Sequence, residues 1–504
     1  MPRNYQCEME RLFSRESRYT IWRKLWFWLA ASQKELGIVY LVPIPNSEPP
    51  AFTEERIDDD DLEQLRHCCY VSSRDVAVPN MRQLSPDHKL DLRAQFHFVT
   101  DIDAPRSEYW LNIGVTPEYI LENTEQILMR DALDILNTKL SMLLYRLQNF
   151  AMDHKSVQCL MYESDLDKTA YVTTIGDRAA GWAKKLVILL RAFQTARLEV
   201  GSAGSQPITQ SEKYNIEFSD KLSMLEHFEG DQSKCERLDD LIRQKLRFQE
   251  CRARDYLAYR RTINANLGFI CILLGSAAVS VVKDLDHFDD GEQLVEKRAN
   301  RNGSPVTDED PKFRQSGILK GAAEALMRVS ISFRDPGVSK TEGQDEYIMA
   351  RMFKQAVRVV NVLQSIVEGL YCDPENGHNV KWSEIPYMMI DPLIRRLMLR
   401  GEVRQDILWH LNNISLSLKD EPQEGRTDRF LETITSYNFF RRYFYDMKEI
   451  VLSLQDVSES ERRVDEICGR NGAIDRVLLP YRPYIREMTA GERQAAQPLM
   501  IEPA

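Results

Sequence analysis

The sequence predicts an all-α fold, and two observations support this class. Between Thr124 and Lys155, apolar residues recur at three- and four-residue steps with no Pro or Gly, which predicts one long amphipathic helix. Runs of alternating β-branched residues, which would indicate strands, are scarce. Similar helical patterns cover 176–199, 220–250, 253–286 and 344–370.

Nearer the N-terminus, the aromatic-rich segment "WRKLWFWLAASQKELGI" (22–38) also predicts a helix. Charged residues stand between its apolar residues, so we expect it to pack on the protein's own core. A partner-binding or membrane-surface helix is the alternative. Residues 41–61 are Pro-rich and then acidic, which indicates an exposed loop.

The longest apolar run, 267–282, has 16 residues. A membrane-spanning helix needs about 20 apolar residues, so the run favours a helix buried in a bundle and no membrane contact. The N-terminus shows no secretory signal pattern.

Three breaks in the helical pattern divide the chain. Residues 79–112 lack clear periodicity, 287–317 are polar, and 372–386 separate the long patterns from shorter ones. The predicted domains are an N-terminal helical domain (1–112), a long-helix bundle that mediates oligomerisation (113–371) and a C-terminal helical domain (372–504).

Composition limits the classes of function. The net charge of −11 argues against a nucleic-acid partner, which would require a basic face. The nine cysteines form no CxxC pair, which favours a reduced, cytoplasmic protein whose cysteines act as small apolar residues. No Cys or His pair has metal-ligand spacing, so we expect neither a metal nor another cofactor.

Several stretches resemble pieces of one enzyme family, in the family's order. They include "WRKLWFWLAASQKELGI", "TTIGDR", "GSAGSQ", "FEGDQSKCERLDDLI" and "LQSIVEGL". Together they resemble adenylosuccinate lyase, most of all its animal form, within the fumarase/aspartase superfamily. The resemblance implies a three-domain fold with a central bundle of five long helices. It also implies a homotetramer with a shared helical core, which would explain why 267–282 is apolar all round.

The family breaks a C–N bond by β-elimination and releases fumarate. The resemblance implies a serine base on a loop, a histidine acid, and cationic and hydroxyl groups that hold the substrate phosphate. Each proton-transfer group is worth about 10²–10⁴ in rate.

The histidine that the family uses as general acid is absent from the matching segment. The family segment resembles T-H-x-Q-P-A-Q-L-T-T-x-G, and here "AYVTTIG" follows "ESDLDKT", with Leu166 at the gap-free position of the histidine. No histidine occurs between His154 and His227. Glu163 or Asp165 could donate a proton if burial raised its pKa, but three acids in a short loop favour a solvated surface.

The serine loop is also altered. The family segment resembles G-S-S-x-M-P-x-K-x-N-P, and here it reads "NRNGSPVTDEDPKFRQ", which leaves Ser304 as the vestigial candidate base. An exposed Gly-Ser-Pro turn is the simpler interpretation. The family's H-D-V-x-A-H segment maps onto "RDVAVP" or "RHCCYV", and neither alignment keeps both histidines.

The phosphate site has lost its cations. The family's R-T-L-D-D-S-A-N-R-R falls on "GVSKTEGQDE", so that Gly337 replaces an arginine, Glu342 the serine and Glu346 a final arginine. Two like charges 4 Å apart repel by about 4 kcal/mol at an effective dielectric of 20. One such reversal would cost about a thousandfold in affinity.

Some substrate-binding positions survive by resemblance. They are Arg3, Thr116, Asn123 and Gln206. Helix capping is the alternative for Thr116 and Asn123, which we expect to flank a helix start.

These losses predict an adenylosuccinate lyase-like pseudoenzyme, retained as an oligomeric scaffold or regulatory subunit. As a regulatory subunit it would form a hetero-oligomer with an active lyase. The alternative is a divergent but active adenylosuccinate lyase in purine nucleotide (AMP/IMP) biosynthesis, with Ser304 as base and a carboxylate or a histidine outside the segment as acid.

Overall fold

A computed structural model describes most of the 504 residues. The described residues are 6–45, 47, 50–71, 88–111, 117–162, 170–200, 231–249, 256–291, 294–296, 314–334, 344–372, 385–417, 426–454 and 456–496. The statements below concern these residues.

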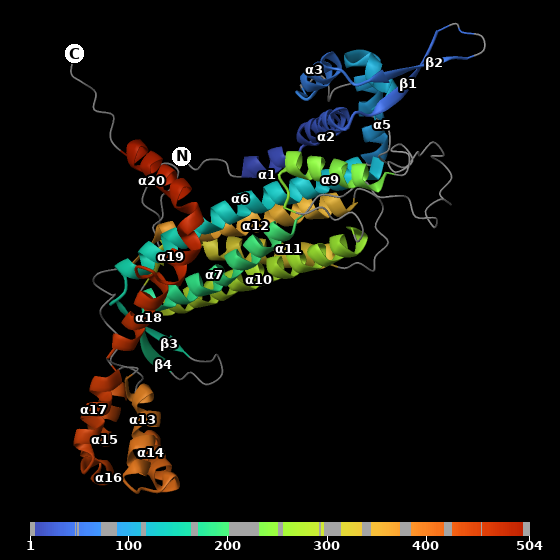
Figure 1. The fold of residues 1–504 in the computed structure, drawn as a ribbon. Coiled ribbons are helices and arrows are strands. Elements are labelled where there is room, and N and C mark those ends of the chain that lie inside the picture. Colours follow the sequence, from blue (N-terminus) through green and yellow to red (C-terminus); the bar gives the residue numbers. More distant parts are fainter. Residues whose placement is uncertain are drawn as a thin grey trace, which may run out of the picture. The chain divides into compact units, whose positions relative to one another are not determined.

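Helices dominate the structure, and five long ones lie side by side (Figure 1). They are α6 (Pro117–Asp153), α7 (Ile175–Glu199), α10 (Tyr256–Gly291), α11 (Arg314–Arg334) and α12 (Gln344–Gly369). The all-α prediction and the five-helix bundle are confirmed. One of the five predicted long helices was wrong. The pattern over 220–250 corresponds to the shorter α9 (Gln232–Leu246), and the fifth long helix is α11, for which no helix was predicted.

Side-chain contacts join neighbouring helices of the bundle. Arg197 of α7 donates from Nε to Asp134 Oδ1 of α6 over 2.7 Å. Trp182 of α7 donates from Nε1 to the buried Asp284 of α10 over 2.5 Å. Gly275 of α10 lies so close to α11 that a Cβ there would be 2.7 Å from Met327 Cγ and 3.1 Å from the Ala323 carbonyl oxygen, so a larger residue would require Met327 to move.

The chain packs as two compact units, and all five long helices contribute to both. One unit comprises 1–139, 189–276 and 322–361, and the other comprises 140–188, 277–321 and 362–504. The three predicted domains, with boundaries near 112 and 371, stay a prediction.

The first unit contains α1 (Gln6–Leu12), α2 (Arg15–Glu35), α3 (Asp59–Cys68), α5 (His88–Phe98) and α9. Ser14 caps α2, since its hydroxyl accepts a hydrogen bond from the Ser17 amide over 3.1 Å. Trp22 and Trp26 of α2 are fully buried, which confirms the prediction of a helix packed on the core. Short π- and 3₁₀-helical segments, Val99–Asp103 and Pro105–Tyr109, follow α5.

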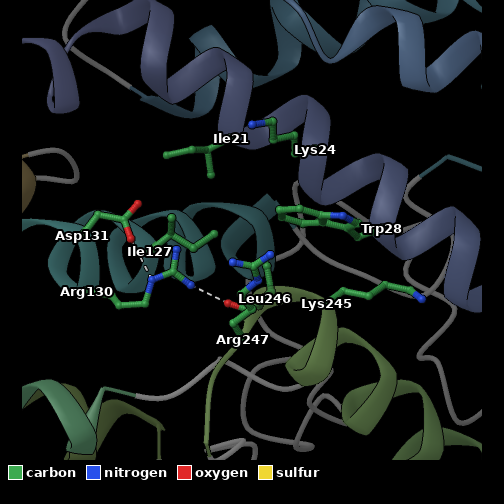
Figure 2. Close-up of a pocket in the computed structure, with 9 residues that line it drawn as sticks. All are labelled: Ile21, Lys24, Trp28, Ile127, Arg130, Asp131, Lys245, Leu246 and Arg247. Carbon is green, nitrogen blue, oxygen red and sulfur yellow. Dashed lines mark hydrogen bonds and ion pairs between the residues drawn. The ribbon is translucent and has the colours of Figure 1, made fainter. Parts of the chain in front are cut away.

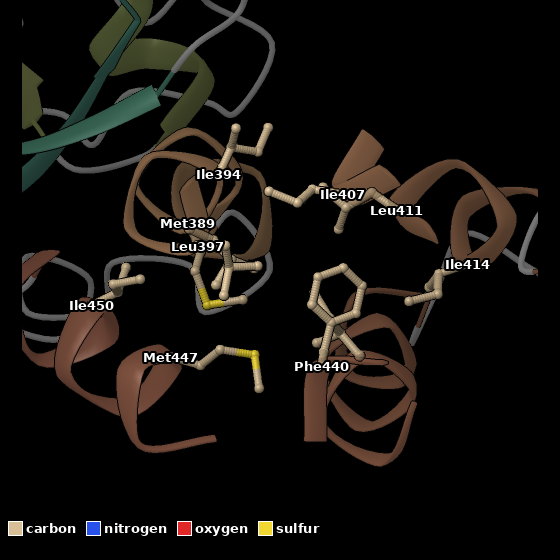
Figure 3. Close-up of a cluster of buried hydrophobic side chains, with 11 residues drawn as sticks. Met389, Ile394, Leu397, Ile407, Leu411, Ile414, Phe440, Met447 and Ile450 are labelled. Carbon is tan, nitrogen blue, oxygen red and sulfur yellow. The ribbon is translucent and has the colours of Figure 1, made fainter. Parts of the chain in front are cut away.

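The second unit ends in short helices. These are α13 (Ile385–Leu399), α14 (Arg404–Ser417), α15 (Arg426–Ser436), α16 (Asn438–Arg441), α17 (Phe444–Leu454), α18 (Ser458–Cys468), α19 (Ala473–Leu478) and α20 (Arg482–Ala496), with a 3₁₀ turn at Leu479–Tyr481. Helices α13 to α17 enclose one apolar cluster around Phe440 and Leu397 (Figure 3).

Three antiparallel strand pairs occur between helices. They are β1 (Val39–Pro43) with β2 (Phe52–Arg56), β3 (Gln158–Tyr162) with β4 (Ala170–Thr174), and β5 (Leu294–Glu296) with β6 (Leu370–Cys372). The loop prediction for 41–61 was therefore wrong, because much of that stretch forms the β1–β2 pair and the start of α3. Strands of three to five residues are too short to produce a clear alternating pattern.

Helix α10 carries the long apolar run. Among the described helices it alone is long and apolar enough to cross a membrane, over Arg261–Asp286, and half of that apolar window is buried within the chain. Phe269 and Leu273, on its other side, are 52% and 41% exposed. A single chain therefore covers only part of the run, and coverage by other subunits stays a prediction.

The described cysteines behave as apolar residues. The six cysteines whose side chains are described are free and buried: Cys68, Cys69, Cys159, Cys235, Cys271 and Cys468. Complete burial raises the pKa of the Cys271 thiol to about 12, so this thiol stays protonated. The prediction that these residues act as small hydrophobes is confirmed.

Candidate functional site

Most residues predicted for the lyase site lie outside the described part of the chain. These are Arg3, Thr116, Leu166, Gln206, Ser304, Gly337 and Glu342. The backbone at Glu346 belongs to the first turn of α12, and its side chain is among those not described. The roles predicted for these residues stay predictions. The strands and the helix that flank the acid segment are among the described residues.

The acid segment connects two paired strands. Strands β3 and β4 are antiparallel, with Tyr162 opposite Ala170, and residues 163–169, including Leu166, link them. Helix α7 begins at Ile175, directly after β4. The retained half of the family segment, "TTIGDR", therefore forms the end of a strand and the first turn of a helix.

Thr173, Thr174 and Asp177 of "TTIGDR" form hydrogen bonds with one another, and Asp177 also binds α18. Thr174 Oγ1 accepts a hydrogen bond from the Asp177 amide over 3.0 Å, as an N-terminal cap does. Thr173 Oγ1 donates to Asp177 Oδ2 over 2.8 Å. Arg463 of α18 donates to both Asp177 oxygens, from Nε over 3.1 Å and from Nη2 over 2.7 Å. Paired hydrogen bonds between charged groups are stronger than neutral ones, so the Asp177–Arg463 pair stabilises the contact between α7 and α18.

The glycine of this motif is required by a close backbone contact. A Cβ at Gly176 would lie 2.5 Å from the Ala151 carbonyl oxygen and 2.7 Å from Lys155 Cα. The Gly176 amide donates to the His154 carbonyl over 3.0 Å, which joins the start of α7 to the end of α6. Packing alone thus explains why a glycine stands here.

His154 is the histidine that precedes the acid segment in the chain. Its Nδ1 lies 2.9 Å from the Phe150 carbonyl oxygen, one helical turn earlier, and its ring lies 4.3 Å from the Phe150 ring. These contacts hold the imidazole against its own helix.

Asn123 is the one predicted binding residue whose side chain is described. It is fully buried in α6, and its Nδ2 donates to the Tyr119 carbonyl over 2.9 Å. Since α6 begins at Pro117, Asn123 lies inside the helix, and the expectation that it flanks the helix start was wrong. Its amide satisfies a carbonyl of its own helix instead.

Lys139 of α6 was not found by sequence reasoning. It is 6% exposed and pairs with Glu8 over 3.0 Å. Burial lowers the pKa of Lys139, and Glu8 offsets part of this effect. Lys139 stands three residues after Leu136 and four before Leu143, both fully buried, so a lysine on the apolar face was the available signal.

Comparisons with known proteins find similarity to adenylosuccinate lyases over most of the chain. The chain is 22% identical over 491 residues to adenylosuccinate lyase of Schizosaccharomyces pombe, and this match covers 95% of both chains. The chain is a relative of adenylosuccinate lyase. The Saccharomyces cerevisiae enzyme matches it at 22% over 95% of both chains, and the Caenorhabditis briggsae enzyme at 24% over 83% of this chain and 82% of that one. No protein-family model matches the sequence.

Solved structures establish the fold of this adenylosuccinate lyase relative. The 3-carboxy-cis,cis-muconate lactonizing enzyme of Pseudomonas putida superposes with a TM-score of 0.69 at 13% identity, covering 94% of this chain and 97% of that one. A fumarate lyase from Mesorhizobium sp. BNC1 gives 0.66 at 14% identity, covering 93% and 99%. The predicted fumarase/aspartase-like fold is confirmed.

Proposed function

We propose that this chain is a catalytically inactive member of the adenylosuccinate lyase group, kept as an oligomeric scaffold or regulatory subunit in the cytoplasm. Two observations together support the proposal. The family's histidine is absent from the acid segment, and every residue of "TTIGDR" has a structural role. No histidine occurs between His154 and His227, and the retained "TTIGDR" residues all have structural contacts, including burial of Ile175 and an ion pair between Arg178 and Asp284 of α10. Stability alone is a sufficient reason for their retention.

The predicted phosphate site supports the same proposal. The aligned segment carries acids where the family has cations, and losing the general acid costs about 10²–10⁴ in rate by itself. Electrostatic repulsion of the substrate phosphate would add to that loss.

A fumarate-release assay with adenylosuccinate tests the proposal, with the Saccharomyces cerevisiae enzyme as positive control. We expect no release above the enzyme-free rate. Release by the wild-type chain that Ser304→Ala abolishes would overturn the proposal and establish the divergent lyase. His154→Gln would then show whether the histidine outside the segment is the acid.

We also propose assembly through α10. The exposed Phe269 and Leu273 lie one turn apart on this helix, and a homotetramer of the family's kind would cover them. Phe269→Glu with Leu273→Glu should reduce the mass measured by light scattering, while Lys320→Glu on the exposed face of α11 should not. An unchanged mass in the double variant would contradict an interface here.

A regulatory role requires mixed assemblies. Co-expression with an active adenylosuccinate lyase, followed by native mass measurement, would detect tetramers containing both chains. If only tetramers of a single chain type are detected, the regulatory role is excluded and the self-associating scaffold remains.

A further inference from the structure

A basic pocket lies within the first unit, between α2, α6 and the C-terminal end of α9 (Figure 2). Its volume is about 370 Å³, within the range of small-molecule sites. The lining residues are Ile21, Lys24 and Trp28 from α2, Ile127, Arg130 and Asp131 from α6, and Lys245, Leu246 and Arg247 from the end of α9. None of them belongs to the residues predicted for the lyase site.

The pocket concentrates positive charge in an acidic protein. Four cations and one carboxylate line it, although the whole chain carries −11. The side chains of Lys24 and Arg247 are exposed, and neither side chain makes a hydrogen bond or ion pair with a described residue. Clustered like charges repel, and an anion bound among them would relieve this repulsion.

Arg130 is fixed in place and marks one wall. Its Nε donates to Asp131 over 2.7 Å, one terminal nitrogen donates to the Leu246 carbonyl, and its guanidinium lies 5.1 Å from the Phe248 ring centroid. These contacts join α6 to the end of α9 and compensate the Asp131 charge. The unpaired charge of the pocket therefore comes mainly from Lys24 and Arg247.

The backbone at Arg247 supplies an independent observation. Arg247 adopts a left-handed conformation, with φ 59° and ψ 37°, where α9 ends. The Phe248 amide donates to Arg243 O over 3.1 Å and the Arg247 amide to Gln244 O over 3.0 Å, which is the Schellman arrangement. Glycine is the usual residue at this position because a Cβ is disfavoured there. An arginine at a glycine position places a guanidinium at the pocket at a conformational cost.

The wall formed by α2 carries an apolar and an aromatic side chain beside Lys24. Ile21 is buried and Trp28 is half-buried, and both belong to α2, whereas Arg247 lies at the end of α9 (Figure 2). An indole offers a flat face for a planar ring, and Lys24 and Arg247 offer donors for a phosphate.

We propose that this pocket binds a small phosphate monoester of a planar aromatic ring. Arg247 holds the phosphate, Lys24 adds positive charge from α2, and Trp28 contacts the ring. The site is independent of lyase activity and goes beyond the proposed function.

Calorimetry on the full chain tests the proposal with three probes: phenyl phosphate, inorganic phosphate and phenol. We expect phenyl phosphate to bind with a dissociation constant below about 1 mM, inorganic phosphate to bind about tenfold more weakly, and phenol not to bind. Failure of phenyl phosphate to bind at 10 times that concentration would overturn the proposal, as would equal binding of phenol.

Variants assign the roles. Arg247→Gly should weaken phenyl phosphate and inorganic phosphate about tenfold each, and it should raise the melting temperature because glycine suits the left-handed position. Lys24→Gln should weaken both anions, whereas Lys320→Gln on α11 should weaken neither. Trp28→Leu should weaken phenyl phosphate and leave inorganic phosphate unchanged. Unaltered phosphate binding in Arg247→Gly and Lys24→Gln would overturn the site.

Discussion

The start of α7 and the end of α9 handle a glycine position in opposite ways. At Gly176 a neighbouring carbonyl excludes any side chain, and the sequence has glycine. At Arg247 the backbone conformation favours glycine, and the sequence has arginine. The first region resembles a catalytic motif yet is explained by packing, whereas the second has no catalytic resemblance yet carries a side chain that packing does not explain. Resemblance to a catalytic motif and a side chain that packing does not explain are therefore two independent indications of function.

The largest effect should come from Gly176→Ala. The added Cβ would meet the backbone of α6 at 2.5 and 2.7 Å, which cannot move as a side chain can, so we expect a loss of about 3 kcal/mol in unfolding free energy. Urea denaturation would measure it.

Gly181→Ala is the matched control on the same helix. A Cβ there meets nothing within 4 Å, so alanine should stabilise by about 0.5–1 kcal/mol. Similar stability of the two variants would show that packing does not explain Gly176.

Asp177→Ala should have the next largest effect. It removes the paired bonds from Arg463 and the bond from Thr173, and we expect a loss of about 2 kcal/mol. A double-mutant cycle with Arg463→Met measures the coupling. Asp134→Ala breaks the Arg197 pair, in which Asp134 is half-exposed, and should cost less than about 1 kcal/mol. Coupling near zero for Asp177 and Arg463 would contradict a structural role for the motif.

Arg247 should respond in the opposite direction. Arg247→Gly should stabilise the chain by about 1 kcal/mol, because it relieves the left-handed strain. Arg247→Ala keeps the strain and should leave the urea midpoint nearly unchanged. Equal midpoints for the two variants would mean that the conformation at Arg247 is not strained.

The smallest effect concerns a charge cluster outside both regions. Burial raises the pKa of Asp446, but hydrogen bonds from Arg396 and Arg400 outweigh it and the pKa lies below its usual value. The lowered pKa means that Asp446 contributes stability above its unfolded pKa near 3.8, and that this contribution disappears as pH falls through the lower folded pKa. Asp446→Asn should cost about 0.5 kcal/mol at pH 7, and the difference from wild type should shrink below pH 4 in urea titrations. A difference that is constant with pH would exclude this electrostatic contribution.

Sequence periodicity predicted the bundle because each long helix repeats its apolar residues over many turns, as α6 does from Thr124 onward. Helix α11 was overlooked, since Gly317, Gly321 and three serines interrupt its pattern. The β3–β4 pair escaped prediction because five residues are too few to show an alternating pattern. The basic pocket brings together positions 24, 130 and 247, and no local pattern links residues so far apart in the chain.

The family motifs were recognisable from sequence, but their present role was not. That "TTIGDR" binds Arg463 depends on α18, which follows it by more than 270 residues. Local sequence could show which side chains were kept, and only the fold could show what they contact.

The buried Cys271 can be used to measure how often the helix bundle opens. Cys271 is fully enclosed and its thiol is protonated, so an alkylating reagent can reach it only when α10 separates from its neighbours. The labelling rate of Cys271, followed by mass spectrometry, would then measure how often the bundle opens under native conditions. Any partner that covers α10 should slow this labelling, whichever partner it is.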